Sequence, residues 1–382
     1  MSSPYSLLPD TAFWQRAIAD LPPGDVDPVG DTAPFKIGLA DRVVTAGSCF
    51  AQHIARYLKG SGFNVSITEP AHPIATPEMA EAFNYGVFSA RYGNIYTARQ
   101  LLQLFQRAYG TFEPTENIWE GDGHWIDPFR PRIQPHGFAS RQEFEADRRK
   151  HFAAVRRAFE ELDVFIFTLG LTESWRSRAD GAVFPLCPGV AGGVFDAERH
   201  EFHNFTATEV ADDLCAFIDA LREVNPKAKV LLTVSPVPLV ATAEPQHVLV
   251  STVYSKSSLR VAAGMVSAAH SDIVYFPSYE IITGSFSRGK YFGADCRSVT
   301  EDGVNHVMRI FFRHFTAGEM QLPADATIPE PKDSHIVQME RVVEVICEEE
   351  MLNVPRPEDR KERRQRRAER RRKRAEAAVA AE

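Results

Sequence analysis

The sequence lacks the features that define several common protein classes. No apolar run reaches the roughly 18 to 20 residues that a membrane-spanning helix needs, and the first ten residues lack the basic and apolar regions of a secretory signal. The five cysteines are widely spaced and form no Cys-x-x-Cys pair, which argues against a disulfide framework or a zinc cluster. No phosphate-binding glycine loop is present. We therefore expect a cytoplasmic protein with reduced thiols, no transmembrane segment, no metal and no cofactor.

Charge is unevenly distributed along the chain. The net charge is -8, yet the residues from Asn353 onward contain twelve Lys/Arg and six Asp/Glu. That segment is thus +6, and the rest of the chain is -14. A basic tail on an acidic body suits contact with a polyanion. The alternative is a solvated, charged helix, since the tail has no aromatic side chains for base stacking.

Short apolar runs alternate with helical stretches, which predicts an α/β fold with a mainly parallel sheet. The runs at 43–46, 164–169, 230–234 and 273–276 are rich in β-branched and aromatic residues, as expected of strands buried on both faces. The helical stretches are 97–109, 141–162, 211–224 and 299–315.

The domain organisation predicted from these patterns has four parts. They are an N-terminal extension packed on the domain (1–40), an α/β domain (41–330), a docking helix (331–352) and a basic helical tail (353–382). Within the domain, residues 83–133 are rich in aromatic residues and glycine, and we interpret them as an insertion that could cover a site.

The first strand leads into a turn, Gly47-Ser48-Cys49, and then into an amphipathic helix that begins near Phe50. A nucleophile at a helix N-terminus has amides and the helix dipole beside it, which stabilise an anion or a thiolate. The structural alternative is that Ser48 caps the helix and that Cys49 is a small buried apolar residue.

Polar turns also follow the next two strands, at 170–173 and 235–238. Ligands of open parallel sheets bind at the carboxyl ends of the strands. The three turns therefore predict one site.

Four segments carry a family resemblance. The turn reads Gly-Ser-Cys-Phe-Ala at 47–51, and the segments 167–175, 255–257 and 276–281 resemble further blocks of the GSCFA domain family, so the resemblance spans about 41–315. GSCFA domains resemble the SGNH (GDSL-like) hydrolases, which are three-layer α/β/α sandwiches and include esterases and glycan O-acyltransferases. The resemblance implies an acyl-ester hydrolase or O-acyltransferase that acts on a small-molecule or glycan substrate. The alternative is a catalytically impaired carbohydrate-binding or polysaccharide-assembly protein.

The same resemblance implies roles for individual residues. Aligning Gly47 with the first SGNH block places Cys49 at the nucleophile and Ser48 at the preceding Asp, although a one-residue slip would expose Ser48 instead. Thr172 stands in the oxyanion-donor block, where Gly170 allows close approach of a substrate. The remaining candidates for oxyanion or substrate binding are Glu173 beside Thr172, Gly86, and the pair Gly93 and Asn94. For Thr172 and Glu173 the structural alternative is capping of a following helix.

The last SGNH block, Asp-x-x-His, is altered here. Its counterpart begins at Asp295, and Ser298 stands in the histidine position. Asp302 and His306 could replace the pair if the helix begins lower, although a histidine there is equally suited to packing. Other candidate bases are His53, His124 and His203. Lys256 and Arg260 could bind an anionic group or form structural salt bridges.

Overall fold

A computed structural model describes residues 3–30, 33–121, 123–317 and 348–352. Four parallel strands form its central sheet, in the order β1-β4-β8-β9. Their bounds are Val43–Gly47 (β1), Val164–Leu169 (β4), Lys229–Val234 (β8) and Ile273–Phe276 (β9). The four predicted strands are confirmed, two of them to the residue.

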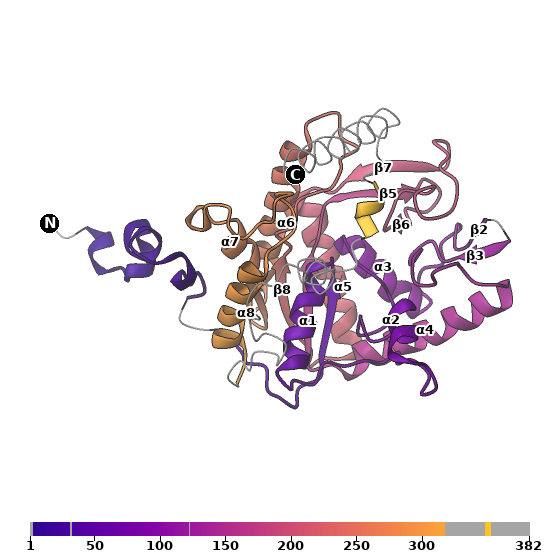
Figure 1. Cartoon of the computed structure of the whole chain (residues 1–382), viewed down its shortest axis with the longest axis horizontal. Coiled ribbons are helices and arrows are strands. Elements are labelled where there is room, and N and C mark those ends of the chain that lie inside the picture. The colour runs from indigo at the N-terminus through magenta and orange to yellow at the C-terminus, as the bar shows by residue number, and fades with distance from the viewer. Residues whose placement is uncertain (1–2, 31–32, 122, 318–347, 353–382) are drawn as a thin grey trace, which may run out of the picture.

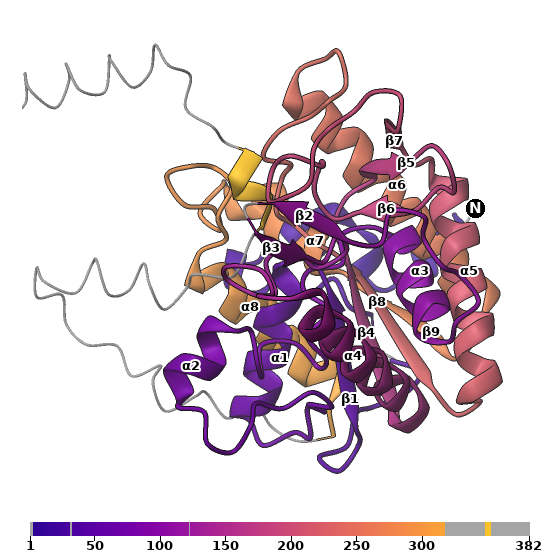
Figure 2. The same cartoon turned by 90° about the vertical axis from the view of Figure 1, so that its right-hand side faces the viewer.

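Helices cover both faces of this sheet, as Figure 2 shows for α1 and α8 on one side and α3 and α5 on the other. Alternate strand residues supply the two cores: Val44 and Phe165 join one, and Val43 and Val164 join the other. The first core contains α3 (Ala98–Ala108), α4 (Arg141–Glu161), α5 (Ala207–Val224) and α6 (Val248–Ala269), and the second contains α1 (Phe50–Gly60), α7 (Ser278–Thr283) and α8 (Glu301–Phe315). The α/β class is confirmed.

Side-chain caps set where these helices begin. Thr97 with Gln100, and Thr206 with Glu209, form capping boxes at the starts of α3 and α5. The second box explains why α5 begins four residues before the predicted start at 211. Thr300 caps α8 in the same way, so α8 begins at Glu301 rather than at 299.

The segment 83–133 divides into two parts. Helix α3 packs against α4 and α5, and its Leu101, Leu104 and Phe105 belong to the main core. A small antiparallel hairpin, β2 (Trp119–Gly121) with β3 (His124–Ile126), lies at the edge of the molecule, away from α2 (Pro77–Ala82). Figure 1 shows α3 within the body and the hairpin outside it. Much of the expected insertion is thus a layer of the sandwich.

A second sheet follows β4 directly. Its antiparallel order is β6-β5-β7, with bounds Val183–Phe184, Glu173–Ser177 and His200–Asn204. The capping interpretation of Thr172 and Glu173 is therefore wrong, because the element after this turn is a strand and not a helix.

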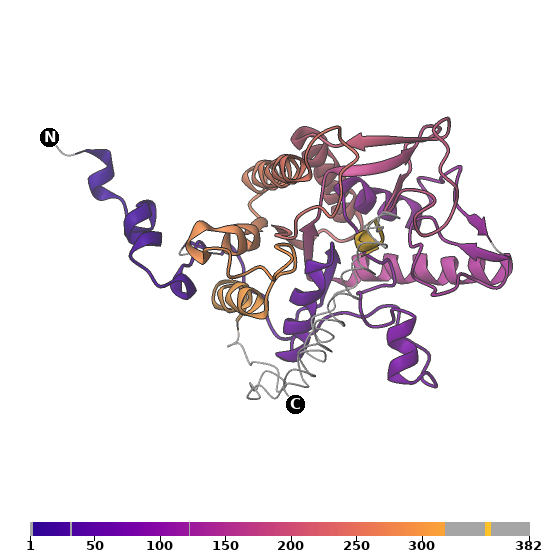
Figure 3. The same cartoon turned by 45° about the horizontal axis from the view of Figure 1, so that its top comes forward.

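The N-terminal extension contacts the domain only through its later residues. Its first short helices, η1 (Pro4–Leu7), η2 (Asp10–Ala12) and η3 (Gln15–Ala19), contain no buried residue and project from the body in Figures 1 and 3. After η4 (Pro23–Asp25), Val26 and Ile37 are buried against α8 and its end. The contacts described between the extension and α8 are made by this second part.

At the other end, the residues 318–347 and 353–382 lie outside the described residues, and with them most of the predicted docking helix and the basic tail. The short helix η7 (Glu348–Leu352) is described, and Glu349 places its carboxylate 3.4 Å from the Arg297 guanidinium. Among the described helices, none is long and apolar enough to cross a bilayer.

Candidate active site at the carboxyl ends of the strands

The turn after β1 requires glycine at position 47. Gly47 has φ +135°, and a Cβ added there would lie 2.3 Å from the carbonyl oxygen of Thr168, its partner on β4. Only glycine tolerates both this conformation and this approach. The Ser48 amide then donates to the same Thr168 oxygen at 3.1 Å. The turn is held against the end of β4.

Both candidate nucleophiles are buried in this turn, with exposed fractions of 4% for Ser48 and 6% for Cys49. The residue at the N-cap of α1 is Cys49, and no side chain caps the helix, so the capping interpretation of Ser48 is wrong. The Ser48 Oγ has no hydrogen-bond partner among the described residues. A buried hydroxyl without a partner costs about 1 to 3 kcal/mol, and such groups are rare in folded proteins.

The turn after β4 meets the first turn. A Cβ added to Gly170 would lie 3.0 Å from the Ser48 Cβ and 3.0 Å from the Tyr96 carbonyl oxygen. That oxygen accepts from the Gly170 and Leu171 amides at 3.1 Å each, and the Ile95 amide donates to the Gly47 oxygen at 2.8 Å. The segment 93–96 therefore joins the two turns.

Lys256 of α6 reaches the same place from the opposite side. It is 2% exposed, and its Nζ donates to the Gly170 carbonyl oxygen at 2.5 Å. The contact with Ser48 and the oxygen bound by Lys256 both belong to Gly170. Only the backbone of this one residue separates them, so the Ser48 Cβ and the Lys256 Nζ lie within about 9 Å of each other. The buried amine and the unpartnered serine hydroxyl thus lie near the same residue, Gly170, without a hydrogen bond between them.

The hydrogen-bond donors of Thr172 are directed away from Ser48. Its hydroxyl donates to the Asn204 Oδ1 at 2.6 Å, and its amide donates to the Ser255 Oγ at 3.0 Å. Glu173 accepts from the Thr242 hydroxyl at 2.6 Å, and burial raises the pKa of its carboxyl. In this conformation the Thr172 side chain binds β7 of the second sheet, and the Glu173 side chain binds the loop after β8.

Asn94 lies beside the nucleophile turn. Gly93 takes φ +73°, and the following Asn94, 2% exposed, accepts from the Gln52 Nε2 of α1 at 3.2 Å. Of the two predicted second-block candidates, the pair Gly93 and Asn94 is therefore placed next to the first turn of α1.

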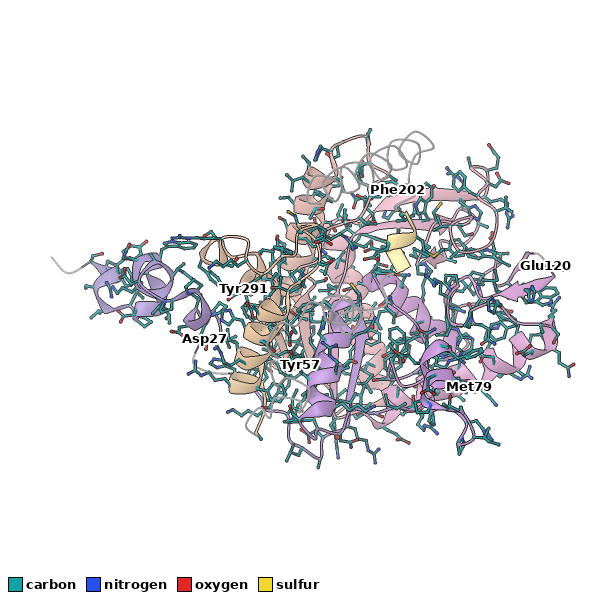
Figure 4. All side chains as sticks on the ribbon, in the orientation of Figure 1. Asp27, Tyr57, Met79, Glu120, Phe202 and Tyr291 are labelled. Carbon is teal, nitrogen blue, oxygen red and sulfur yellow. The ribbon has the colours of Figure 1, made fainter. Side chains whose placement is uncertain are left out.

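His306 is placed elsewhere. Its Nε2 donates to the Val26 carbonyl oxygen at 2.9 Å, and its Nδ1 accepts from the Tyr291 hydroxyl at 2.8 Å. Figure 4 shows Tyr291 on the side of α8 where Asp27 and the N-terminal extension lie. Both ring nitrogens are thus engaged, and Asp302 lies exposed in the first turn of α8. The structure does not bring this pair to the nucleophile turn.

The altered last block forms a closed turn. The Ser298 hydroxyl donates to the Asp295 Oδ2 at 2.6 Å, and the Ser298 amide donates to Oδ1 at 3.0 Å. Both residues are exposed. Asp295 and Ser298 thus bind each other in this turn.

The remaining histidines differ in place and environment. His203, on β7, lies 2.9 Å from the Glu209 carboxylate, and His124 is exposed on the hairpin. His53 lies one helical turn after Cys49 on α1, on the same helix face, and burial together with Arg56 lowers its pKa to about 3. His53 is the one predicted base that shares an element with the nucleophile turn.

Comparison with known families agrees with this geometry. The model of the GSCFA family matches residues 42–311, from the first strand almost to the end of α8. The chain belongs to the GSCFA family. No curated protein matches it in sequence.

Asn204 was missed by sequence reasoning. Besides accepting from Thr172, it donates to the Glu244 Oε1 at 2.9 Å and so connects the second sheet to the loop after β8. The strand that carries it, His200–Asn204, is short and polar, and only its pairing with β5 brings it to the site.

Proposed function

We propose that this GSCFA protein is an acyl-ester hydrolase or O-acyltransferase whose nucleophile lies in the Gly47-Ser48-Cys49 turn. One observation carries the proposal: a buried, unpartnered serine hydroxyl packs on the residue whose carbonyl holds a buried lysine amine. The carbohydrate class of the substrate rests on the resemblance to SGNH enzymes alone.

In the proposed reaction Ser48 attacks the ester carbonyl and Lys256 acts as the base. Serine–lysine pairs replace the serine–histidine pair in several hydrolases, and the amine must be neutral to accept the proton. Because the Ser48 Oγ and the Lys256 Nζ are not hydrogen-bonded to each other, the proton passes from Oγ to Nζ through a bridging water and then to the departing alcohol. Water, or a sugar hydroxyl in a transferase, then attacks the acyl-serine.

Cys49 is the second candidate nucleophile. Its position at the start of α1 favours a thiolate, because the helix dipole lowers the pKa of a thiol there. His53 is a poor base for it, since a pKa of about 3 lies more than five units below that of an ordinary thiol, a cost of about 7 kcal/mol. A reaction at Cys49 would therefore depend on the helix N-terminus.

The oxyanion formed in either case would lie at the first turn of α1. The first amides of a helix have no partner within the helix, so they suit a developing negative charge. Removal of one such donor costs about 3 kcal/mol in related acyl-transfer sites. The hydroxyl of Thr172 contributes only if it leaves Asn204.

Hydrolysis of p-nitrophenyl acetate by the wild type and by Ser48→Ala, Cys49→Ala and Lys256→Met variants tests this proposal. We expect S48A and K256M each to lower kcat at least 100-fold and C49A to lower it less than 10-fold. Lys59→Met is the matched control, because Lys59 is exposed on α1 and losing its charge should change nothing. A large loss in C49A alone transfers the nucleophile to Cys49. Equal activity in all variants refutes the assignment to this turn.

A binding or assembly protein without turnover is the second candidate. It is favoured by the engagement of both His306 nitrogens and by Ser298 in the histidine position. An inactive wild type that binds an acetylated oligosaccharide, with the affinity reduced in a Ser48→Trp variant, would support it.

A further inference from the structure

A small cavity lies beside the segment 92–95, which also contacts the nucleophile turn through the Ile95 amide. Helix α3, helix α4 and the segment 127–133 enclose it, and its most exposed lining residues, Gln100 and Phe129, are themselves half-buried. The space open to the centre of a water molecule there is about 20 Å³, more than a single ordered water requires. A tetrahedral oxyanion is compact, because each of its oxygens lies one covalent bond from the central atom. Such an anion therefore fits this space.

Arg107 is the unusual member of the lining. It is 8% exposed, and its guanidinium carbon lies 3.6 Å from the centre of the Phe129 ring. Among the described residues its side chain makes no hydrogen bond, and the charge of the buried Asp127 carboxylate acts on it without an ion pair. Its five N–H donors therefore have no direct partner there. Burial lowers its pKa to about 9, which is the effect of desolvating a cation. An anion in the cavity would satisfy it.

Neighbouring Arg130 differs from Arg107, because its donors are already used. It bonds Asp127 at 2.8 Å and Asp147 at 2.7 Å. No carboxylate lines the cavity, whereas two arginines and a histidine do. The lining is therefore positive where Arg107 is unsatisfied.

His151 supplies a second unsatisfied group. It is 1% exposed, its Nδ1 lies 2.8 Å from the Glu69 carboxylate, and its Nε2 is buried without a partner among the described residues. Burial alone would raise the pKa of Glu69, but hydrogen bonds from His151 and Arg91 and the charge of Arg130 hold it at about 2. A carboxylate only accepts, so Nδ1 carries the proton. Burial lowers the pKa of His151, and its neutral ring leaves Nε2 as an acceptor.

We propose that this cavity binds inorganic phosphate, with its anionic oxygens on Arg107 and its hydroxyl donating to the His151 Nε2. A ligand there must offer both negative oxygens and a proton donor. Phosphate at neutral pH carries both, whereas sulfate carries the charge without the proton. Asn94 and Gln103 also line the cavity, and the side-chain amide of Gln103 is engaged by the Gly181 oxygen and the Val183 amide. The site is independent of whether the Gly47-Ser48-Cys49 turn is catalytic.

Calorimetric titration of the full chain with inorganic phosphate, and separately with sulfate, at pH 7 tests the proposal. We expect saturable binding of phosphate and at least 10-fold weaker binding of sulfate. Arg107→Met should lower the affinity for phosphate at least 10-fold, while Arg107→Lys should retain a measurable part of this affinity. His151→Asn keeps a donor for Glu69 and removes the Nε2 acceptor, so the affinity for phosphate should fall to the level of that for sulfate.

Arg148→Met is the matched control. Arg148 lies on α4, stacks on Phe144 and donates to the Asn117 oxygen, but it does not line the cavity. Like Arg107→Met, this substitution removes one positive charge from the region, but it should leave the affinity for phosphate within twofold of that of the wild type. Absence of saturable binding in the wild type overturns the proposal and leaves the cavity to water. Equal binding of sulfate and phosphate, or an equal loss in R148M, overturns it as well.

Discussion

Gly170 contacts Ser48, so adding one methyl group at Gly170 tests the geometry of the site. In Gly170→Ala the new Cβ meets the Ser48 Cβ and the Tyr96 oxygen at 3.0 Å each, closer than nearly all real Cβ contacts. Gly170 does not have a positive φ, so the substitution introduces crowding without backbone strain. Overpacking of this kind costs typically 1 to 3 kcal/mol.

Relief of this crowding must move Ser48 or the segment 93–96. For a domain of this size we expect the melting temperature to fall by about 2 to 4 °C per kcal/mol. We also expect kcat on p-nitrophenyl acetate to fall at least 10-fold, because a displacement of about 1 Å at a reacting group costs up to 100-fold. The melting curve and the rate are measured on the same preparation.

Gly121→Ala is the control for this experiment. Gly121, on the hairpin, has no atom within 4 Å of an added Cβ and no positive φ, so neither stability nor rate should change. A G170A protein with the stability and the rate of the wild type would show that the two turns are not in contact, and the reasoning about Ser48 would be refuted.

Four further predictions concern other parts of the molecule. Arg130→Met should lower the free energy of unfolding by about 3 to 5 kcal/mol, since it leaves the fully buried Asp127 carboxylate without its ion-pair partner and takes one of two arginines from the partly buried Asp147. Arg107→Met breaks no hydrogen bond, so it should change the free energy of unfolding by less than about 1 kcal/mol. A loss in urea unfolding as large as that of R130M would show that Arg107 is structural. Burial raises the pKa of Asp213 to about 6 despite Arg99, so the folded state binds this proton more tightly than the unfolded state. The unfolding free energy should therefore decrease as the pH rises from about 4 to about 6, by on the order of 3 kcal/mol, and a D213N variant that keeps the full slope in urea titrations would contradict this origin. Deletion of residues 353–382 should remove any salt-sensitive heparin binding and leave esterase activity unchanged; equal heparin retention by both forms would exclude the tail as a polyanion site.

The sequence alone determined the central layers of this protein. The runs that became β1, β4, β8 and β9 consist of residues buried on both faces, so their composition depends little on which neighbour covers them. The turn at Gly47 was equally predictable, because a strand and an amphipathic helix flank a residue that only glycine can supply. Local chemistry decides these features.

The tertiary structure alone decided which side chains meet. The strands β5 and β7 are short and polar, and their pairing brings Asn204 to Thr172, which turns a predicted oxyanion donor toward a neighbour. The N-terminal extension engages His306, some 280 residues away in sequence. The position of Lys256 beside Gly170, the burial of Arg107 and the unpartnered Nε2 of His151 have the same cause. Each depends on contacts between segments far apart in the chain, and no local pattern of residues encodes such contacts.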